Sequence, residues 1–394
     1  MTLVCAPIKR WPKTLPVDLY EITEGPFKFL YDSNKNLVFR DVDWRQPQPG
    51  DIISYHNFDQ TPELEGVLTQ MKERHPKACY YKVATFAKST LDSLRMLHFQ
   101  RRHPEVIGVC MGEKGAITRI LAPIFGCPIV YAPLSEEDKN SPGQLLWSEL
   151  SVIYRFKTLT PRSSIYGLIG DPLHRSVGHL FHNERFLYIK MNVTQDELAM
   201  FFRLIEDMPF KGLSVTAPLK EKVCLFLKKI APEAKAIGAV NTLIRTQMGW
   251  EGFNTDGKAA VDLLGAVQDK KVVVLGSGGV ARSIIYELIK RNAVVTIVNR
   301  TQKRGIALAK EMRCHFSAEQ PPCDILINAT SASDLHGFAP IVMDVNIGQT
   351  AFLKRAKERG CNIIDGFEMY LNQAVAQQGY FIPIEIETCG QALE

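Results

Sequence analysis

Short apolar runs alternate with longer amphipathic stretches along most of this chain. Strand-like runs occur at Asp51–Tyr55, Cys79–Val83, Val106–Cys110 and Pro128–Tyr131, and helical periodicity lies between the later ones. Strands that alternate with helices are typical of parallel βαβ units. The pattern therefore predicts an α/β protein.

Four further strand candidates fill the first fifty residues: Leu3–Ala6, Asp18–Ile22, Phe27–Tyr31 and Leu37–Val42. They stand too close together for parallel crossovers, which need about a dozen residues or more. A full (β/α) barrel typically takes about 250 residues, and this region has about 160. We predict a shortened or incomplete (β/α) barrel. Either its early helices are absent, or its first strands pair as hairpins, with a turn at Asp32–Leu37.

The remaining chain is predicted to hold two more α/β units. Proline and small polar residues in Lys157–Ser164 indicate a linker, and the strand Ile165–Gly170 opens the second unit. A helix at Glu368–Ala376 is expected to return to that unit. The predicted domains are residues 1–158 (barrel region), residues 162–265 with 366–394 (substrate-binding domain) and residues 266–365 (Rossmann-like NADP domain).

A glycine-rich turn follows the apolar strand Val272–Leu275. Glycines permit a tight turn and close approach to a pyrophosphate, a small residue lets the next helix pack on the sheet, and the helix N-terminus favours an anion. The residues expected in these roles are Gly276, Gly278, Gly279 and Ala281. A tight strand–helix turn without a nucleotide is the plainer alternative.

The next strand, Val294–Val298, ends where NAD enzymes usually carry a carboxylate for the ribose 2′-hydroxyl. The residues that stand there are Asn299, Arg300, Thr301 and Arg304. Two guanidinium groups suit a 2′-phosphate, and no carboxylate repels it. The sequence therefore predicts an NADP(H) site, with surface arginines as the alternative.

Composition narrows the class of partner. The net charge of +5 is dispersed, which favours small anionic molecules over nucleic acid or a membrane. The nine cysteines are scattered without a C-x-x-C pair, which indicates reduced thiols in a cytoplasm, with neither a metal site nor disulfides. No apolar run reaches the roughly eighteen residues of a membrane span, and charge occupies the place of a signal peptide. The pattern makes no prediction of oligomeric state.

Four polar stretches lie at the ends of apolar runs between the linker and the glycine loop. They are Gly170–Ser176, Ser214–Glu221, Gly238–Leu243 and Gly252–Gly257. Ligands of α/β domains bind at the carboxyl ends of strands. Together with Gln373 these stretches supply hydroxyl, amide, lysine and carboxylate groups, which suit a small polyhydroxylated acid.

Residues 164 to about 380 resemble shikimate dehydrogenase. The motifs S-V-T-x-P-x-K, G-A-V-N-T-L, N-T-D-G, G-x-G-G-x-A, N-R-T-x-x-R and N-A-T-S occur in that family's order. The resemblance implies NADPH-dependent reduction of 3-dehydroshikimate to shikimate, with Lys220 and Asp256 as the catalytic pair. The substrate-binding residues that it implies are Ser176, Thr216, Asn241 and Gln373. An ordinary surface ion pair is the alternative for Lys220 and Asp256.

The chain departs from that family at several places, and the helix after His182-Asn183 looks abridged. The family's S-x-S is reduced to Ser176, for which Arg175 or His174 could compensate. The family's D-x-x-Y reads Asp344-Val-Asn-Ile347. These changes bear on substrate affinity more than on the type of reaction.

Three polar residues stand at strand ends of the barrel region: His56, Lys82 and Arg119. Burial disfavours the charge of a lysine inside an apolar strand and makes its amine nucleophilic. A histidine one strand earlier can move protons for it. The alternative is a lysine that snorkels from an edge strand beside a core histidine.

Residues 51 to about 150 are similar to the second half of type I 3-dehydroquinate dehydratase, through S-Y-H-N-F, Y-K-V-A, M-G-x-x-G-x-x-x-R and S-P-G-Q. The resemblance implies a Schiff base at Lys82 and proton transfer by His56. The substrate-binding residues that it implies are Glu21, Arg119 and Gln144. Thr23 stands where the family's E-x-R has its arginine.

A dehydratase joined to a dehydrogenase is the arrangement of the bifunctional shikimate-pathway enzymes of plants and chlamydiae. We therefore predict a fusion that dehydrates 3-dehydroquinate and then reduces 3-dehydroshikimate with NADPH. The alternative is an NADP-dependent dehydrogenase only, whose N-terminal region is a non-catalytic scaffold or interaction module. The missing helices and the missing arginine favour that alternative.

Overall fold

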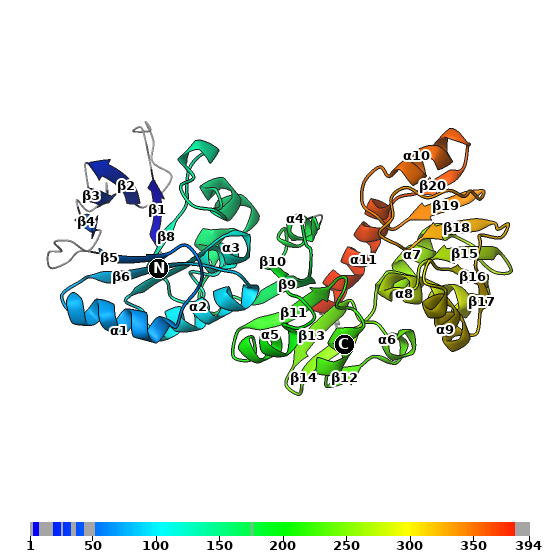
Figure 1. Cartoon of the computed structure of the whole chain (residues 1–394), viewed down its shortest axis with the longest axis horizontal. Helices are drawn as coiled ribbons and strands as arrows, with labels where there is room; N and C mark the ends of the chain where they lie inside the picture. The colour runs from blue at the N-terminus through cyan, green and yellow to red at the C-terminus, as the bar shows by residue number, and fades with distance from the viewer. Residues whose placement is uncertain are drawn as a thin grey trace, which may run out of the picture. The chain divides into compact units, whose positions relative to one another are not determined.

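A computed structural model describes residues 3–7, 19–24, 27–32, 37–42, 52–174 and 176–382, the first four segments by backbone only. Its contacts divide the chain into two compact units, Met1–Phe210 and Lys211–Glu394. Figure 1 labels most of the helices and strands of both units.

The first unit opens with an eight-stranded sheet. Its parallel strands β5 (Ile52–Asn57), β6 (Tyr80–Phe86) and β7 (Val106–Met111) are joined by α1 (Leu64–Arg74) and α2 (Thr90–Arg102). The side chain of Ser89 caps α2, and Asp92 reciprocates at the backbone of Ser89, so the helix begins in a capping box. These βαβ units confirm the strands predicted here.

The early strands pair largely as hairpins. They are β1 (Leu3–Pro7), β2 (Leu19–Glu24), β3 (Phe27–Asp32) and β4 (Leu37–Val42). β2 with β3 and β3 with β4 are antiparallel, whereas β1 lies parallel to both β2 and β8 (Ile129–Tyr131). The sheet order is β7-β6-β5-β4-β3-β2-β1-β8, and within the described residues its two end strands, β7 and β8, do not pair with each other. The barrel is thus incomplete, and of the two alternatives the hairpins are correct.

Smaller elements complete the first unit. α3 (Ala116–Ile120) follows β7, and β9 (Ile165–Gly170) pairs in parallel with β10 (Tyr188–Asn192). α4 (Gly178–His182) and α5 (Leu198–Leu204) flank β10 in the chain. Single turns of 3₁₀ or π helix lie at Glu113–Gly115, Glu136–Asp138, Glu149–Ile153 and Phe156–Thr158.

A small mixed sheet occupies the start of the second unit. β11 (Phe210–Val215), β13 (Thr242–Thr246), β14 (Gly249–Phe253) and β12 (Lys229–Ile230) lie in that order, with only the last pair parallel. A 3₁₀ helix at Lys222–Phe226 and α6 (Pro232–Ile237) lie between β11 and β13 in the chain.

A six-stranded parallel sheet forms the rest of the second unit, in the order β17-β16-β15-β18-β19-β20. Its strands are β15 (Lys271–Leu275), β16 (Val294–Val298), β17 (His315–Ser317), β18 (Ile325–Asn328), β19 (Ile341–Asp344) and β20 (Asn362–Ile364). The helices are α7 (Asp256–Leu264), α8 (Gly279–Lys290), α9 (Gln302–Met312) and α10 (Ala351–Glu358). This confirms the Rossmann-like part of the fold.

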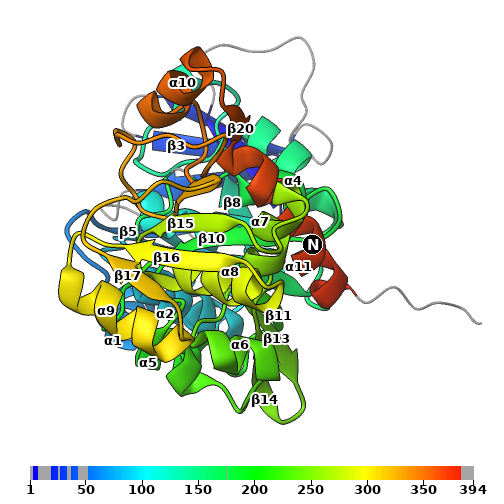
Figure 2. The ribbon, with the colours of Figure 1, turned by 90° about the vertical axis from the view of Figure 1, so that its right-hand side faces the viewer.

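Both faces of this sheet are covered by helices. Val272 and Val274 of β15 pack in the core beneath α8 and α9, a side that Figure 2 shows. Val273 and Leu275, which point the other way, pack with Phe352 of α10. A strand buried on both faces must be apolar at every position, which explains the unbroken run in the sequence.

The last helix, α11 (Gly366–Phe381), lies against α7 and β13. Gln377 of α11 accepts a hydrogen bond from the hydroxyl of Ser214 at 2.9 Å and donates to the backbone oxygen of Asn241 at 2.9 Å. The tail thus returns to the segment that holds the mixed sheet. Among the helices of the described residues, none is long and apolar enough to cross a bilayer.

A buried histidine generates a prediction about acid stability. His182 at the end of α4 is 1 % exposed beside Tyr188 and Phe186, and burial lowers its pKa to about 4. Below about pH 6.5 the imidazole of His182 binds a proton in the unfolded chain but stays neutral in the folded chain. The free energy of unfolding therefore falls as the pH falls toward about 4. We expect His182→Phe to lose less stability than the unmutated chain between pH 7 and pH 5, by on the order of 2 kcal/mol. Urea unfolding at both pH values measures this difference, and equal losses would contradict it.

Candidate active sites

A buried ion pair lies at the centre of the second unit's polar cluster. Nζ of Lys220, which follows β11, donates to Oδ2 of Asp256 at 2.6 Å, and the two side chains are 11 % and 4 % exposed. Asp256 is the first residue of α7. The pair is buried, which does not fit the alternative of an ordinary surface ion pair.

The second oxygen of Asp256 is also occupied. Nδ2 of Asn241 donates to Oδ1 of Asp256 at 2.8 Å, and the backbone N–H of Asp256 donates to Asn254 at 3.0 Å. Oε1 of Gln373 lies 3.3 Å from the same Asn241 nitrogen. Both carboxylate oxygens of Asp256 thus have donors, which fix the orientation of the carboxylate toward Lys220.

The other predicted substrate-binding residues lie at strand ends. Thr216 follows β11, is partly exposed, and its backbone oxygen accepts from the N–H of Leu219 at 2.9 Å. Ser176 belongs to the first unit, in the loop after β9, where its N–H donates to the backbone oxygen of Leu173 at 3.0 Å. The second unit therefore brings together Lys220, Asp256, Asn241 and Gln373.

The glycine loop has the shape that a nucleotide requires. Gly276 has a φ of 116°, and a Cβ there would lie 2.9 Å from the backbone oxygen of Ala329. A Cβ at Gly278 would meet nothing within 4 Å, so this side of the loop is open. A Cβ at Gly279 would lie 3.0 Å from Cβ of Lys220, so this glycine lets the lysine pass the start of α8. Ala281 is buried, as helix–sheet packing demands.

The residues after β16 fit a 2′-phosphate. Arg300, Thr301 and Arg304 are exposed, and neither guanidinium has an acidic partner within the described part of the chain. Nδ2 of Asn299 donates to the backbone oxygen of Thr301 at 2.8 Å and holds the turn. Two unpaired cations beside an open glycine loop at a helix N-terminus suit a phosphorylated dinucleotide.

A supporting network at this end of the sheet was not predicted. Asp344 is fully buried: its Oδ1 accepts from Nδ2 of Asn328 at 3.0 Å, and its Oδ2 accepts from the hydroxyl of Thr350 at 2.6 Å. Nδ2 of Asn346 also donates to Oδ1, at 2.8 Å. These bonds join the N-A-T-S loop to the end of β19. The motifs were visible in the sequence, but their pairing across two strands was not.

Lys82 is buried within the first sheet. It is 7 % exposed in β6, and its Nζ lies 4.1 Å from the ring centre of Tyr131 in β8. Lys82 pairs in register with Ser54, so His56, two residues further along β5, points to the same face as Lys82. His56 is exposed and stacks on Phe58, with ring centres 5.9 Å apart, so it is not a core histidine.

Arg119 and Gln144 lie in the segments that follow β7 and β8. Arg119 of α3 is 4 % exposed; its Nη1 donates to the backbone oxygen of Cys110 at 2.7 Å, and its Nε has no hydrogen bond within the described residues. Burial lowers the pKa of its guanidinium to about 10, which leaves it charged at neutral pH. Oε1 of Gln144 accepts from the backbone of Asn140 at 2.8 Å and so shapes its own loop. Glu21 lies on β2, where only the backbone is described.

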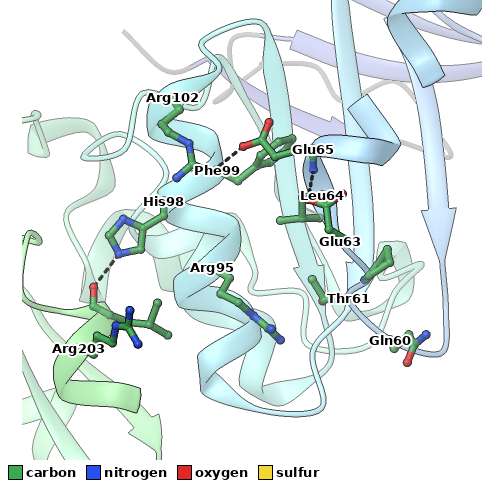
Figure 3. Close-up of a pocket in the computed structure, with 12 residues that line it drawn as sticks. Gln60, Thr61, Glu63, Leu64, Glu65, Arg95, His98, Phe99, Arg102 and Arg203 are labelled. Carbon is green, nitrogen blue, oxygen red and sulfur yellow. Dashed lines mark hydrogen bonds and ion pairs between the residues drawn. The ribbon is translucent and has the colours of Figure 1, made fainter. Parts of the chain in front are cut away.

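A cavity of about 650 Å³ lies away from all these residues, between α1, α2 and the end of α5. Figure 3 shows Arg102 paired with Glu65 on one side, and His98 of α2 beside Arg203 of α5 on the other. None of the predicted catalytic residues lines it. It therefore adds nothing to either candidate active site.

Sequence profiles of known families divide the chain as these sites do. Residues 45–161 match type I 3-dehydroquinase, residues 168–243 match the substrate-binding domain of shikimate dehydrogenase, and residues 258–337 match shikimate/quinate 5-dehydrogenase. Fold and profiles together define a type I dehydroquinase fused to an NADP-type dehydrogenase.

Whole-chain relatives have the same two parts. The chain is 36 % identical to the shikimate biosynthesis protein AroDE of Chlamydia trachomatis, over 86 % of this chain and 74 % of that protein. It is 29 % identical to the chloroplastic bifunctional 3-dehydroquinate dehydratase/shikimate dehydrogenase of Arabidopsis thaliana, over 83 % of this chain and 62 % of that protein. The chain belongs to the family of bifunctional shikimate biosynthesis proteins.

Solved structures resemble the dehydrogenase part. Shikimate dehydrogenase from Aquifex aeolicus has a TM-score of 0.53 and 28 % identity, and covers 57 % of this chain and 94 % of its own. The enzyme from Thermus thermophilus, solved in complex with NADP(H) and shikimate, has a TM-score of 0.50 and 27 % identity, and covers 55 % and 93 %. NADP is thus the cofactor, and the substrates are small molecules of the shikimate pathway.

The exposed arginines after β16 predict the cofactor preference. We expect the unmutated chain to use NADPH far better than NADH, and Arg300→Ala to narrow that ratio about tenfold to a hundredfold, because a charged hydrogen bond is lost. Lys310→Ala, near the end of α9, removes an equal charge away from the loop after β16 and should leave the ratio unchanged. Steady-state kinetics with both cofactors provide the measurement. Equal use of NADPH and NADH by the unmutated chain would rule out this assignment.

Proposed function

We propose that the two candidate active sites catalyse two successive reactions of the shikimate pathway. The barrel region dehydrates 3-dehydroquinate to 3-dehydroshikimate through a Schiff base at Lys82, and the dehydrogenase half reduces 3-dehydroshikimate to shikimate with NADPH. The observation that carries the second assignment is the buried pair of Lys220 and Asp256 next to the glycine loop. The buried Lys82, on one face with His56, supports the first.

In the dehydrogenase site, Lys220 interacts with the ketone oxygen of the substrate. When bound, NADPH supplies the hydride that reduces the ketone. Charge then develops on the ketone oxygen, and Nζ of Lys220 hydrogen-bonds to it and donates the proton. Asp256 aligns Lys220 through their hydrogen bond, and Asn241 holds Asp256 through the second carboxylate oxygen. Thr216, Gln373 and Ser176 bind the hydroxyl and carboxylate groups of the substrate.

In the dehydratase site, the uncharged amine of Lys82 attacks the substrate's ketone carbon, and loss of water gives the imine. The imine draws electrons from the neighbouring C–H bond, whose proton His56 accepts. His56 returns a proton to the departing hydroxyl, which leaves as water. Hydrolysis of the imine then releases the product and restores Lys82. Arg119, Gln144 and Glu21 bind the substrate.

An alternative assigns chemistry to the dehydrogenase half alone. The open barrel, with hairpins where parallel barrels have helices, favours it. So does Thr23, which stands where the dehydratase family has an arginine. In this alternative the first sheet is a scaffold or interaction module.

We retain the division into residues 1–158, 162–265 with 366–394, and 266–365 as a proposal. The bonds of Gln377 to Ser214 and to the backbone of Asn241 support the return of the tail to the substrate-binding domain. We also propose a cytoplasmic location. The seven cysteines that the structure describes are all free thiols, which suits a reducing compartment.

Removal of the lysine ammonium tests the dehydrogenase chemistry. We expect Lys220→Ala to lower turnover of shikimate about a hundredfold or more, the scale of a positioned acid–base group, while NADPH binding changes little. Lys258→Ala is the matched control, because this α7 lysine is 73 % exposed and, among the described residues, pairs only with Asp262. Turnover and cofactor titration separate the two effects. Unchanged turnover in Lys220→Ala would show that the ion pair is structural.

Chemical trapping tests the dehydratase site. Borohydride added with 3-dehydroquinate should reduce the imine and attach the substrate to Lys82, as peptide mass spectrometry detects. Lys82→Arg should abolish both the adduct and dehydration, whereas Lys88→Arg, at an exposed turn just after β6, should change neither. A folded chain that turns over shikimate but gives no adduct and no dehydration would favour the scaffold alternative.

A further inference from the structure

We propose that Thr90, a residue of the dehydratase half, positions the substrate-binding loop of the dehydrogenase half. The loop is Asp171–Ser176, which follows β9. The inference rests on the proposed role of Ser176 at the substrate. It makes Thr90 a positioning residue, because its side chain acts through Asn192 and Asp171 and touches no substrate.

Helix α2 of the barrel region lies along the β10–α5 segment within the first unit. At its start, the hydroxyl of Thr90 donates to the backbone oxygen of Asn192 at 2.6 Å, and Ser89 bonds to the carboxylate of Glu197. At its end, Nε2 of His98 donates to the backbone oxygen of Leu204 at 2.6 Å. Contacts at both ends fix the register between α2 and this segment, so Thr90 faces Asn192 reproducibly.

Asn192 connects Thr90 to the loop Asp171–Ser176. It is the last residue of β10 and pairs in register with Gly170, the last residue of β9. Its Nδ2 donates to Oδ1 of Asp171 at 3.0 Å, so the side chain of Asn192 holds the first loop residue while Thr90 holds its backbone. Further along, Leu173 is 2 % exposed and accepts the N–H of Ser176. The loop is thus anchored at Asp171 and Leu173, just before Ser176.

Thr90 is also close in the chain to the dehydratase site. Thr90 comes four residues after the end of β6, the strand that carries Lys82. Between them, Ala87 is 3 % exposed and its N–H donates to the backbone oxygen of Met111 at 3.1 Å. Thr90 itself is 1 % exposed. A closely packed backbone therefore runs from the strand of Lys82 to the loop of Ser176.

Removal of the buried hydroxyl of Thr90 should weaken shikimate binding at the dehydrogenase site. In Thr90→Val the shape is kept, but the backbone oxygen of Asn192 loses its buried donor, and the loop loses one anchor. We expect the KM for shikimate to rise about threefold to tenfold, the effect of one hydrogen bond. The KM for NADP and kcat should stay within about twofold, because the catalytic pair and the glycine loop lie in the second unit. Thr90→Ser, which keeps the hydroxyl, should restore the KM.

Two further variants sharpen the experiment. Asn192→Ser removes the donor to Asp171, so it should raise the same KM, and its effect should not add to that of Thr90→Val, since both act through one loop. Arg203→Ala is the matched control. Arg203 lies at the end of α5 in the cavity of Figure 3, and its guanidinium has no ion pair within the described residues, so the KM should not change.

The outcomes separate cleanly. An unchanged KM for shikimate in a folded Thr90→Val overturns the proposal. A fall in kcat together with a similar rise in the KM for shikimate and in the KM for NADP also overturns it, because such changes would mean general destabilisation. If the unmutated chain fails to turn over shikimate, the proposed function fails instead. Hydrogen exchange of residues 171–176 then still tests the link: faster exchange in Thr90→Val than in Thr90→Ser supports it, and equal exchange overturns it.

Discussion

The buried ion pair between Lys220 and Asp256 constrains the whole dehydrogenase half. Two charges taken out of water need close geometry and further hydrogen bonds to be tolerated, and removal of one partner leaves the other uncompensated. Asn241, the residue just before β13, supplies one such hydrogen bond, and Gly279 leaves room for the lysine at the start of α8. The pair therefore ties the mixed sheet to the nucleotide-binding sheet, and residues far apart in the chain depend on it.

The barrel region satisfies a different constraint. Its strands β2 to β4 are too closely spaced for helical crossovers, so antiparallel pairing is the arrangement open to them. The later strands keep their helices, and with them the surroundings of Lys82 and Arg119. The part of the barrel that carries the candidate chemistry is thus the part that retains regular βαβ geometry.

The pattern of apolar and polar residues predicted those elements that depend on residues near each other in the chain. The apolar runs located β15 and β16, and the short spacing of the early strands left hairpins as one of two alternatives. Contacts between distant residues escaped prediction, because no local period marks them. The bonds of Asp344 to Asn328 and Thr350 are one example, and the bond of Thr90 to Asn192 is another. The exposure of His56 was also not predicted, since the strand pattern alone does not show whether the end of β5 is covered by other parts of the fold.

The return of α11 has a consequence for biosynthesis. Gln373 and Gln377, which contact Asn241, belong to the last helix that the structure describes. During translation the chain emerges from its N-terminus, so the barrel region can fold early, as domains generally do. The dehydrogenase site must wait until more than a hundred further residues after Asn241 have left the ribosome. A nascent chain should therefore acquire its two activities in sequence, the dehydratase first.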